Sequence, residues 1–268
     1  MRIGMSKRDL YERVKRATVA IVMEIPNRLP KKPFTIVGSG FCIHKEGIIV
    51  TCEHVFRAFF DENAYQELMK DLPEENNPRA IEHRHIKQQP QVMFLGGIQG
   101  TEIFMPVVGI SDATIKQGFD VALFKLPKHN AFPNGYPTIE VADYDELHEM
   151  QEIATCGFPL GDGLFDQLGT VTSSFTTGRI SSIIPLAGVP ASDVKGYQLD
   201  LTATNGNSGG PVFSLESGKV FGVLQGGVIH PGWGTIFQGI AKAEPIHPAV
   251  EDGVVQRLID GTHRPKGL

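Results

Sequence analysis

Residues 205–213, NGNSGGPVF, place a serine between glycines, and this stretch suggests covalent chemistry more directly than any other part of the chain. Its segment GNSGG, residues 206–210, matches the pattern G-x-S-x-G. Glycines on both sides let the backbone turn so that successive N–H groups face one small space, which an oxyanion can occupy. Ser208 is therefore a candidate nucleophile.

The same pattern occurs in α/β-hydrolases, where the serine lies between a strand and a helix and the chain order is serine, acid, histidine. Here two glycines and Pro211 follow Ser208 and lead into the strand-like segment VFSL, so no helix begins there. The later histidines also lack a preceding acid at a clear strand end; they are His230, His247 and His263. The sequence thus disfavours an α/β-hydrolase elbow and directs the search for a base upstream.

A nucleophilic hydroxyl needs a base to take its proton and an acid to hold that base in the right tautomer. His54 ends the β-like run GIIVTCEHV, and Asp120 immediately precedes the apolar run VALFKL. Taken singly, a structural histidine and a turn-forming aspartate are the more common interpretations. Together, the chain order His, Asp, Ser with these flanks makes a catalytic triad the stronger hypothesis.

The elements that must position these residues are short apolar and β-branched runs separated by Gly, Pro and Asn turns, such as FTIVGSGFCI and KVFGVLQGGV. Many short strands without interleaved helices predict an all-β sandwich or pair of barrels. Ser6 followed by Asp9 predicts a capped N-terminal helix within residues 1–18. Pro248 and Gly261 bracket a predicted closing helix over residues 248–260.

These blocks together resemble the chymotrypsin-like (trypsin-like) serine proteases, closest in style to bacterial HtrA-type protease domains without a PDZ domain. Residues 38–55, GSGFCIHKEGIIVTCEHV, resemble the segment that leads into the catalytic histidine. DVALFKL resembles the segment that begins with the catalytic aspartate, and NGNSGGPV resembles the nucleophile loop. CGFPLG, GTVTSSFTTGRISS and GKVFGVLQGG resemble the second barrel.

The resemblance implies an all-β fold of two antiparallel six-stranded barrels, with an N-terminal and a C-terminal helix. The first barrel would span residues 19–135, and residues 136–268 would hold the second barrel and the last helix. Residues 61–90 are polar and predict a surface insertion in the first barrel. Within that segment, His83 and His85 fit a solvated loop better than a metal site.

By the same resemblance, Ser208 would attack the scissile carbonyl, His54 would act as general base and then acid, and Asp120 would orient the imidazole. The backbone N–H groups of Gly206 and Ser208 would form the oxyanion hole. The S1 pocket would have its base at Thr202 and Ala203 and one wall along Gln225, Gly226 and Gly227. Because none of these residues is charged, an uncharged P1 residue is expected. No metal or other cofactor is expected.

The resemblance implies a protein or peptide substrate, and a regulatory protein is a further expected partner. The 268 residues carry a net charge of -5, with acidic and basic residues mixed, so nucleic acid is not expected. The uncharged window 220–241 contains several glycines and Pro231, which fits paired strands better than a membrane span. A membrane partner is therefore not expected either.

Three cysteines without a C-x-x-C pair argue against a disulfide framework and a zinc knuckle, and Cys42 and Cys52 would be out of register across a hairpin at residues 45–47. The first apolar run, residues 17–23, is too short and poorly flanked for a signal sequence. These observations predict a cytoplasmic protein.

Two alternatives to a serine endopeptidase use the same fold. A catalytically silent binding or scaffold protein is possible because a fold alone does not guarantee activity. An esterase with the same triad is chemically allowed because both reactions are acyl transfers. The filled triad positions and the intact GNSGG loop favour the peptidase.

Overall fold

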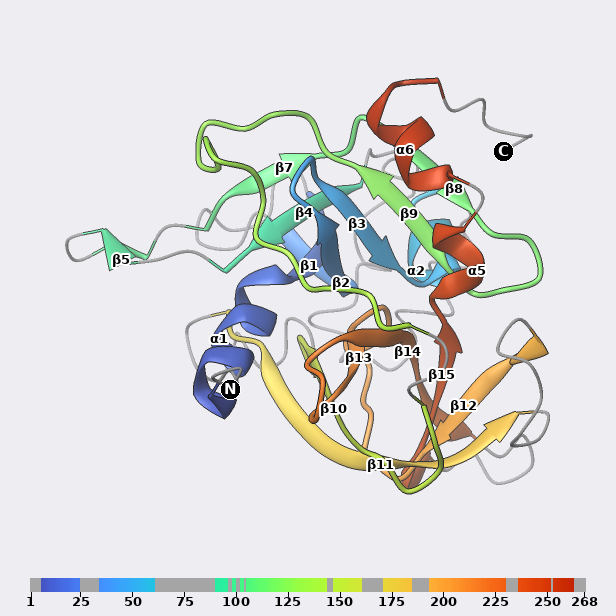
Figure 1. The fold of residues 1–268 in the computed structure, drawn as a ribbon. Coiled ribbons are helices and arrows are strands. Elements are labelled where there is room, and N and C mark those ends of the chain that lie inside the picture. The colour runs from blue at the N-terminus through green and yellow to red at the C-terminus, as the bar shows by residue number, and fades with distance from the viewer. Residues whose placement is uncertain are drawn as a thin grey trace, which may run out of the picture.

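The computed structural model describes residues 6–24, 34–60, 90–95, 98–99, 102–103, 105–143, 147–160, 171–184, 193–229, 236–251 and 253–262. Two β structures follow each other along the chain and lie against each other (Figure 1). We call them the first lobe and the second lobe. The predicted insertion lies outside the described residues apart from Pro90, and so do His83 and His85.

The first lobe is a curled antiparallel sheet of seven strands in the order β7-β4-β1-β2-β3-β9-β8. Its strands are β1 (Thr18–Glu24), β2 (Phe34–His44), β3 (Ile48–Thr51), β4 (Gln91–Phe94), β7 (Val107–Gly109), β8 (Asp112–Ile115) and β9 (Ala122–Lys125). A separate pair, β5 (Ile98–Gln99) and β6 (Glu102–Ile103), extends from it (Figure 1). The hairpin between β2 and β3 turns at residues 45–47, as predicted.

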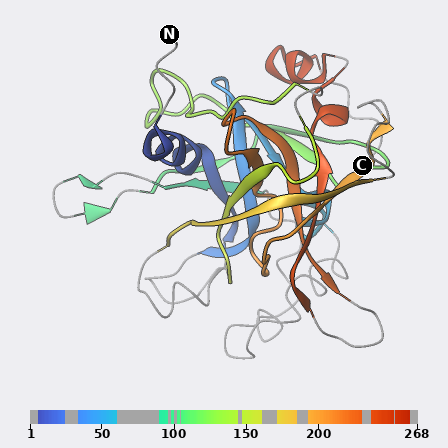
Figure 2. The same ribbon diagram turned by 60° about the horizontal axis from the view of Figure 1, so that its bottom comes forward.

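The second lobe is a closed antiparallel barrel of six strands in the order β10-β11-β12-β15-β14-β13. Its strands are β10 (Glu152–Gly157), β11 (Ser174–Ile184), β12 (Gly196–Leu199), β13 (Pro211–Ser214), β14 (Val220–Ile229) and β15 (Ile236–Pro245). Figure 2 shows the same arrangement from a second direction. The predicted all-β class is confirmed, although the first lobe is a curled sheet whose edge strands do not pair among the described residues. The division at residue 135/136 falls between β9 and β10 and stays a prediction.

The N-terminal helix α1 (Lys7–Ala17) begins where its capping signal predicted. The Ser6 hydroxyl accepts a hydrogen bond from the Asp9 N–H at 3.1 Å, which satisfies one of the free donors of the first turn. Its buried residues, Leu10, Val14 and Ala17, recur at helical spacing. Arg13 donates to the Gly218 carbonyl of the second lobe at 3.1 Å, so the helix contacts both lobes.

The predicted closing helix is divided into α5 (His247–Val250) and α6 (Val254–Ile259). Glu251 takes an extended conformation and ends α5. Both helices follow the second barrel in the chain, yet they lie on the side of the first lobe, where α6 contacts β3 (Figure 1). The C-terminal segment therefore returns to the first lobe.

One large hydrophobic cluster, which we call the shared core, contains buried residues from both lobes. Phe41 and Phe124 come from the first lobe, Phe213 and Val223 come from the second, and Leu258 comes from α6. A smaller cluster fills the second barrel around Tyr197 and Phe221. The shared core fixes the lobes against each other, and the candidate residues lie where the lobes meet.

Candidate functional site

His54 and Asp120 form a hydrogen-bonded pair in the first lobe. His54 lies in the short helix α2 (Glu53–Arg57), directly after β3, and Asp120 lies just before β9, the strand that pairs with β3. His54 Nδ1 is 2.6 Å from Asp120 Oδ2, and the His54 backbone N–H donates to Asp120 Oδ1 at 2.9 Å. An ionised carboxylate can only accept, so this contact places the proton on Nδ1 and leaves Nε2 free to accept.

Ser208 lies in a tight loop directly before β13, and β2 of the first lobe forms hydrogen bonds with this loop. The Ser39 N–H of β2 donates to the Ser208 carbonyl at 2.8 Å, and the Ser39 hydroxyl donates to the Gly206 carbonyl at 2.6 Å. Gly209 has φ +89, and a Cβ there would lie 2.0 Å from the Ser39 carbonyl oxygen, so only glycine fits. Ser39 was missed from the sequence, although a serine between two glycines in a strand was a usable signal.

The Ser208 hydroxyl donates to the backbone carbonyl of Gln225 at 2.6 Å. Among the hydrogen bonds of the described residues, none joins Ser208 to His54. Catalytic hydrogen bonds are often long or poorly aligned without substrate and tighten only in the substrate complex. The resting hydroxyl would therefore have to turn from Gln225 to His54 before any attack.

Gln225 also contacts Asp120 through its side chain. Its Nε2 donates to Asp120 Oδ2 at 3.1 Å, so the same residue contacts both the carboxylate and the serine. Burial acts to raise the pKa of the Asp120 carboxyl, but the hydrogen bonds and charge of His54, with the Gln225 hydrogen bond, outweigh burial and lower that pKa. The sequence placed Gln225 only in the S1 wall and missed this contact.

The two N–H groups named for the oxyanion hole have no acceptor among the described residues. The Leu160 N–H donates to the Asn205 carbonyl at 2.7 Å. In a trans peptide the C=O and the following N–H point in opposite directions, so this contact turns the Gly206 N–H away from Leu160. Leu160 is half-exposed with φ 58, a sparsely populated conformation for leucine.

The residues predicted for the S1 pocket differ in exposure. Thr202 is exposed, whereas Ala203 is buried in the core of the second barrel. Gly226 and Gly227 lie in β14 opposite Lys242 and Ala241 of β15. Lys242 Nζ lies 3.0 Å from Glu244 Oε1, so a charged pair that the sequence analysis missed lies on the strand that pairs with Gly226.

Cys52 lies beside the His54–Asp120 pair. Its sulfur, a His54 ring nitrogen and an Asp120 oxygen all lie within 4.8 Å of one another, and the thiol donates to the Leu224 carbonyl at 3.2 Å. Burial, with the charge of Asp120, raises the pKa of this thiol well above its usual value. A metal ion would have to break the His54–Asp120 hydrogen bond and deprotonate this thiol, so the three groups fit a hydrogen-bonded cluster better than a metal site.

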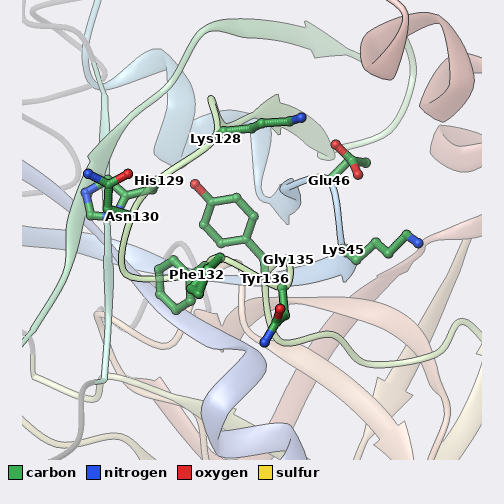
Figure 3. Close-up of a pocket in the computed structure, with 10 residues that line it drawn as sticks. Lys45, Glu46, Lys128, His129, Asn130, Phe132, Gly135 and Tyr136 are labelled. Carbon is green, nitrogen blue, oxygen red and sulfur yellow. The ribbon is translucent and has the colours of Figure 1, made fainter.

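An open pocket of about 670 Å³ lies elsewhere, between the β2–β3 turn and the segment after β9 (Figure 3). Lys45, Glu46, Lys128 and Tyr136 are among its lining residues, and none of the candidate site residues lines it. The Tyr136 hydroxyl donates to the Pro127 carbonyl at 2.6 Å, and burial raises the pKa of Tyr136 to about 12. That hydroxyl is therefore a neutral structural donor.

Comparison with known proteins gives consistent results. Residues 38–223 match the family model described as "Trypsin-like peptidase domain". The "Probable periplasmic serine endoprotease DegP-like" of Brucella suis biovar 1 (strain 1330) is 29% identical over 222 residues, which cover 83% of this chain and 33% of that protein. The protein of the same name from Rhizobium meliloti (strain 1021) is 30% identical over 226 residues, which cover 84% and 34%. The chain thus spans about a third of these relatives.

Among solved structures, the HtrA-type protease AlgW with tripeptide has a TM-score of 0.57 and 19% sequence identity to this chain. The match covers 97% of this chain and 65% of that one. At this level of identity the likeness supports the fold, and it agrees with the two lobes described above. Within the described residues, no helix has the length and apolar character needed to span a bilayer.

The predicted cytoplasmic location is contradicted, because both relatives are named as periplasmic proteins. The prediction relied on the unpaired cysteines and on the lack of a recognisable signal sequence in residues 1–25. The structure shows Cys42, Cys52 and Cys156 to be free and buried. A buried thiol with a raised pKa is poorly reactive in any compartment, so unpaired cysteines do not report the location of this protein.

Proposed function

The chain belongs to the family of trypsin-like peptidase domains, and from this premise we propose that it is a serine endopeptidase that uses Ser208, His54 and Asp120. One observation carries the proposal. Gln225 contacts Asp120 with its side chain at 3.1 Å and Ser208 with its carbonyl at 2.6 Å. Since Asp120 also binds His54 at 2.6 Å, all three side chains lie within one hydrogen-bonded cluster between the lobes.

In the proposed mechanism the Ser208 hydroxyl leaves the Gln225 carbonyl and donates to Nε2 of His54. His54 takes the proton as Ser208 Oγ attacks the scissile carbonyl carbon, and Asp120 stabilises the imidazolium through Nδ1. His54 then gives the proton to the leaving amine as the C–N bond breaks, which leaves an acyl group on Ser208. Water attacks the acyl group with His54 as base, and the carboxylic acid product leaves.

The backbone N–H groups of Gly206 and Ser208 are proposed to hold the oxyanion that develops during attack. Two features support this assignment: neither group has an acceptor among the described residues, and the Leu160 contact orients the peptide before Gly206. Loss of one such donor typically costs about 10²- to 10³-fold in rate. The orientation of this peptide should therefore contribute to the rate, although less than the nucleophile does.

The proposed substrate is a protein or peptide with an uncharged P1 residue. Thr202, Gly226 and Gly227 carry no charge, and the Lys242 ammonium already has Glu244 as its partner. An apolar pocket separates related side chains by only about 1–3 kcal/mol per methylene, so a broad preference is expected. The regulatory protein partner stays a prediction.

One experiment tests both activity and preference. A proteome-derived peptide library is digested with the wild type, with Ser208→Ala and with Ser217→Ala, which removes an exposed serine of the second lobe. Mass spectrometry of the new termini should show cleavage after uncharged residues by the wild type and the control. Ser208→Ala should lower turnover by about 10⁶-fold.

The results also separate the alternatives. A fluorophosphonate probe should label the wild type and Ser217→Ala but not Ser208→Ala. No labelling and no cleavage would favour a silent scaffold. Labelling with hydrolysis of small esters but no peptide cleavage would favour an esterase, and cleavage mainly after basic or acidic residues would overturn the P1 proposal.

A further inference from the structure

Strand β14 contains an irregularity at Gln225. Leu224 pairs with Ala243 of β15, and Gly226 pairs with Lys242, so two steps along β14 match one step along β15. Gln225 is the extra residue of this β-bulge. A bulge turns a side chain out of the regular alternation of a strand, and bulges occur often beside active sites.

The bulge directs Gln225 towards the candidate triad. Leu224, its neighbour, exchanges two backbone hydrogen bonds with the nucleophile loop: its carbonyl accepts from Gly209 at 2.7 Å, and its N–H donates to Gly210 at 2.9 Å. These bonds hold Gln225 next to Ser208. Gly226, the next residue, has φ +139, a conformation that a residue with a side chain rarely adopts.

The donors around Asp120 show what the Gln225 amide contributes. His54 supplies two of them, its backbone N–H to Oδ1 and its Nδ1–H to Oδ2. Cys52, also of the first lobe, lies close to the same carboxylate. Among the described contacts, Gln225 supplies the hydrogen bond that reaches this carboxylate from the second lobe. Without it, the His54–Asp120 pair could shift as a unit relative to Ser208.

We infer that Gln225 is a positioning residue, whose side-chain amide fixes the His54–Asp120 pair of the first lobe relative to the nucleophile of the second. The inference rests on the proposed function, because it assigns a role in the same reaction. The amide acts through Asp120 and does not touch the substrate. Its effect should therefore fall on turnover and not on substrate binding.

The test compares Gln225→Ala and Gln225→Glu with Gln151→Ala. Gln225→Glu keeps the size of the side chain but, when ionised, cannot donate to Asp120. Gln151 is a matched control, since it is buried in the same lobe and its Nε2 donates to the Ser214 hydroxyl at 3.0 Å, outside the candidate site. Thermal unfolding of all three variants identifies any general loss of stability.

Both Gln225 variants should lower kcat by about 10- to 100-fold, because small displacements of reacting groups are costly, while KM changes little. Gln151→Ala should keep the wild-type kcat. Unchanged kcat in Gln225→Ala, or an equal loss in Gln151→Ala, would overturn the inference. A rise in KM with kcat unchanged would also overturn it, because that result assigns the side chain to substrate binding.

A second measurement does not depend on activity. Proton NMR can follow the His54 Nδ1–H in its hydrogen bond to Asp120, as a resonance far downfield, in the wild type and in the Ser208→Ala background. Gln225→Ala should shift or broaden this resonance, and Gln151→Ala should not. If the wild type proves inactive, the proposed function fails while the NMR result still decides the role of Gln225; an unchanged resonance overturns that role.

Discussion

Asp120 accepts the hydrogen bonds that join the side chains of His54 and Gln225 in the candidate site. Its carboxylate accepts from the backbone and ring of His54 and from the amide of Gln225. Burial opposes its ionisation, yet these partners together lower its pKa. An ionised Asp120 therefore contributes to folding as well as to the proposed reaction.

Acidification should remove the contribution of Asp120 to stability. The folded-state pKa of Asp120 is lowered, so the folded protein binds a proton at Asp120 less readily than the unfolded chain does. Aspartates in an unfolded chain titrate at about pH 3.9. The contribution is fully present above that unfolded pKa and is lost as pH falls through the folded pKa. Urea unfolding should show that the free energy of unfolding of the wild type exceeds that of Asp120→Asn by more at about pH 6 than at about pH 3.

Asp143→Asn, which removes an exposed carboxylate, serves as the control for this comparison. A gap for Asp120→Asn that stays constant or widens on acidification would contradict the proposed balance between burial and hydrogen bonding at Asp120.

The sequence identified the three residues that carry the proposed chemistry, because each lies at a recognisable strand end or loop. It did not identify the second contact of Gln225, since that contact depends on a bulge that no local pattern marks. It also missed Ser39, whose contacts with the nucleophile loop arise only when the lobes pack. Residue types are thus visible in the sequence, whereas contacts between lobes are not.

At the scale of elements, β14 contains Gln225 and the two glycines that follow it, Gly226 and Gly227. Its bulge depends on Gly226, which has φ +139. A Cβ at this position would lie 3.6 Å from the Ser208 hydroxyl oxygen, an ordinary contact, so the cost of a side chain there is mainly backbone strain.

Gly226→Ala should lower the free energy of unfolding by about 1–3 kcal/mol and should also reduce kcat/KM. Gly109→Ala in β7 is the control, because its added Cβ would meet no described atom within 4 Å, and it should be neutral or slightly stabilising. Urea unfolding and steady-state kinetics measure the two effects. Equal stability of the two variants would argue against strain at the bulge.

Most strands and α1 could be predicted, because apolar runs between turn residues and the Ser6 cap are local signals. The closing helix was predicted as one element and is two, since Glu251 turns to an extended conformation that the bracketing Pro248 and Gly261 do not reveal. The open edges of the first lobe were not foreseen either, because closure depends on pairing between distant strands.

At the scale of the whole molecule, the shared core joins the lobes into one packed unit. Cys42 lies in the first lobe, Cys156 lies in the second, and Cys52 lies under the candidate triad, and all three belong to this core. Burial raises the pKa of Cys42 to about 12 and that of Cys156 to about 11, and it raises that of Cys52. The three thiols therefore report on the opening of both lobes.

Native protein should resist iodoacetamide at all three cysteines, and partial denaturation should expose them together. Few thiolates form in the folded state, and the lobes share the core that protects them. Mass spectrometry of alkylated peptides at increasing urea gives a separate labelling curve for each cysteine. Labelling of Cys156 at urea concentrations that leave Cys42 protected would show that the lobes unfold independently.

The shared core also has a consequence for the way this chain can be divided. Each lobe contributes buried apolar residues to this one core, and α6, which follows the second barrel in the chain, contributes Leu258 to it. Cleavage between β9 and β10 would separate the first lobe from α5 and α6. It would also expose apolar surface on both fragments. We therefore expect the two halves to be obtained in folded form only when they are produced together and reassociate.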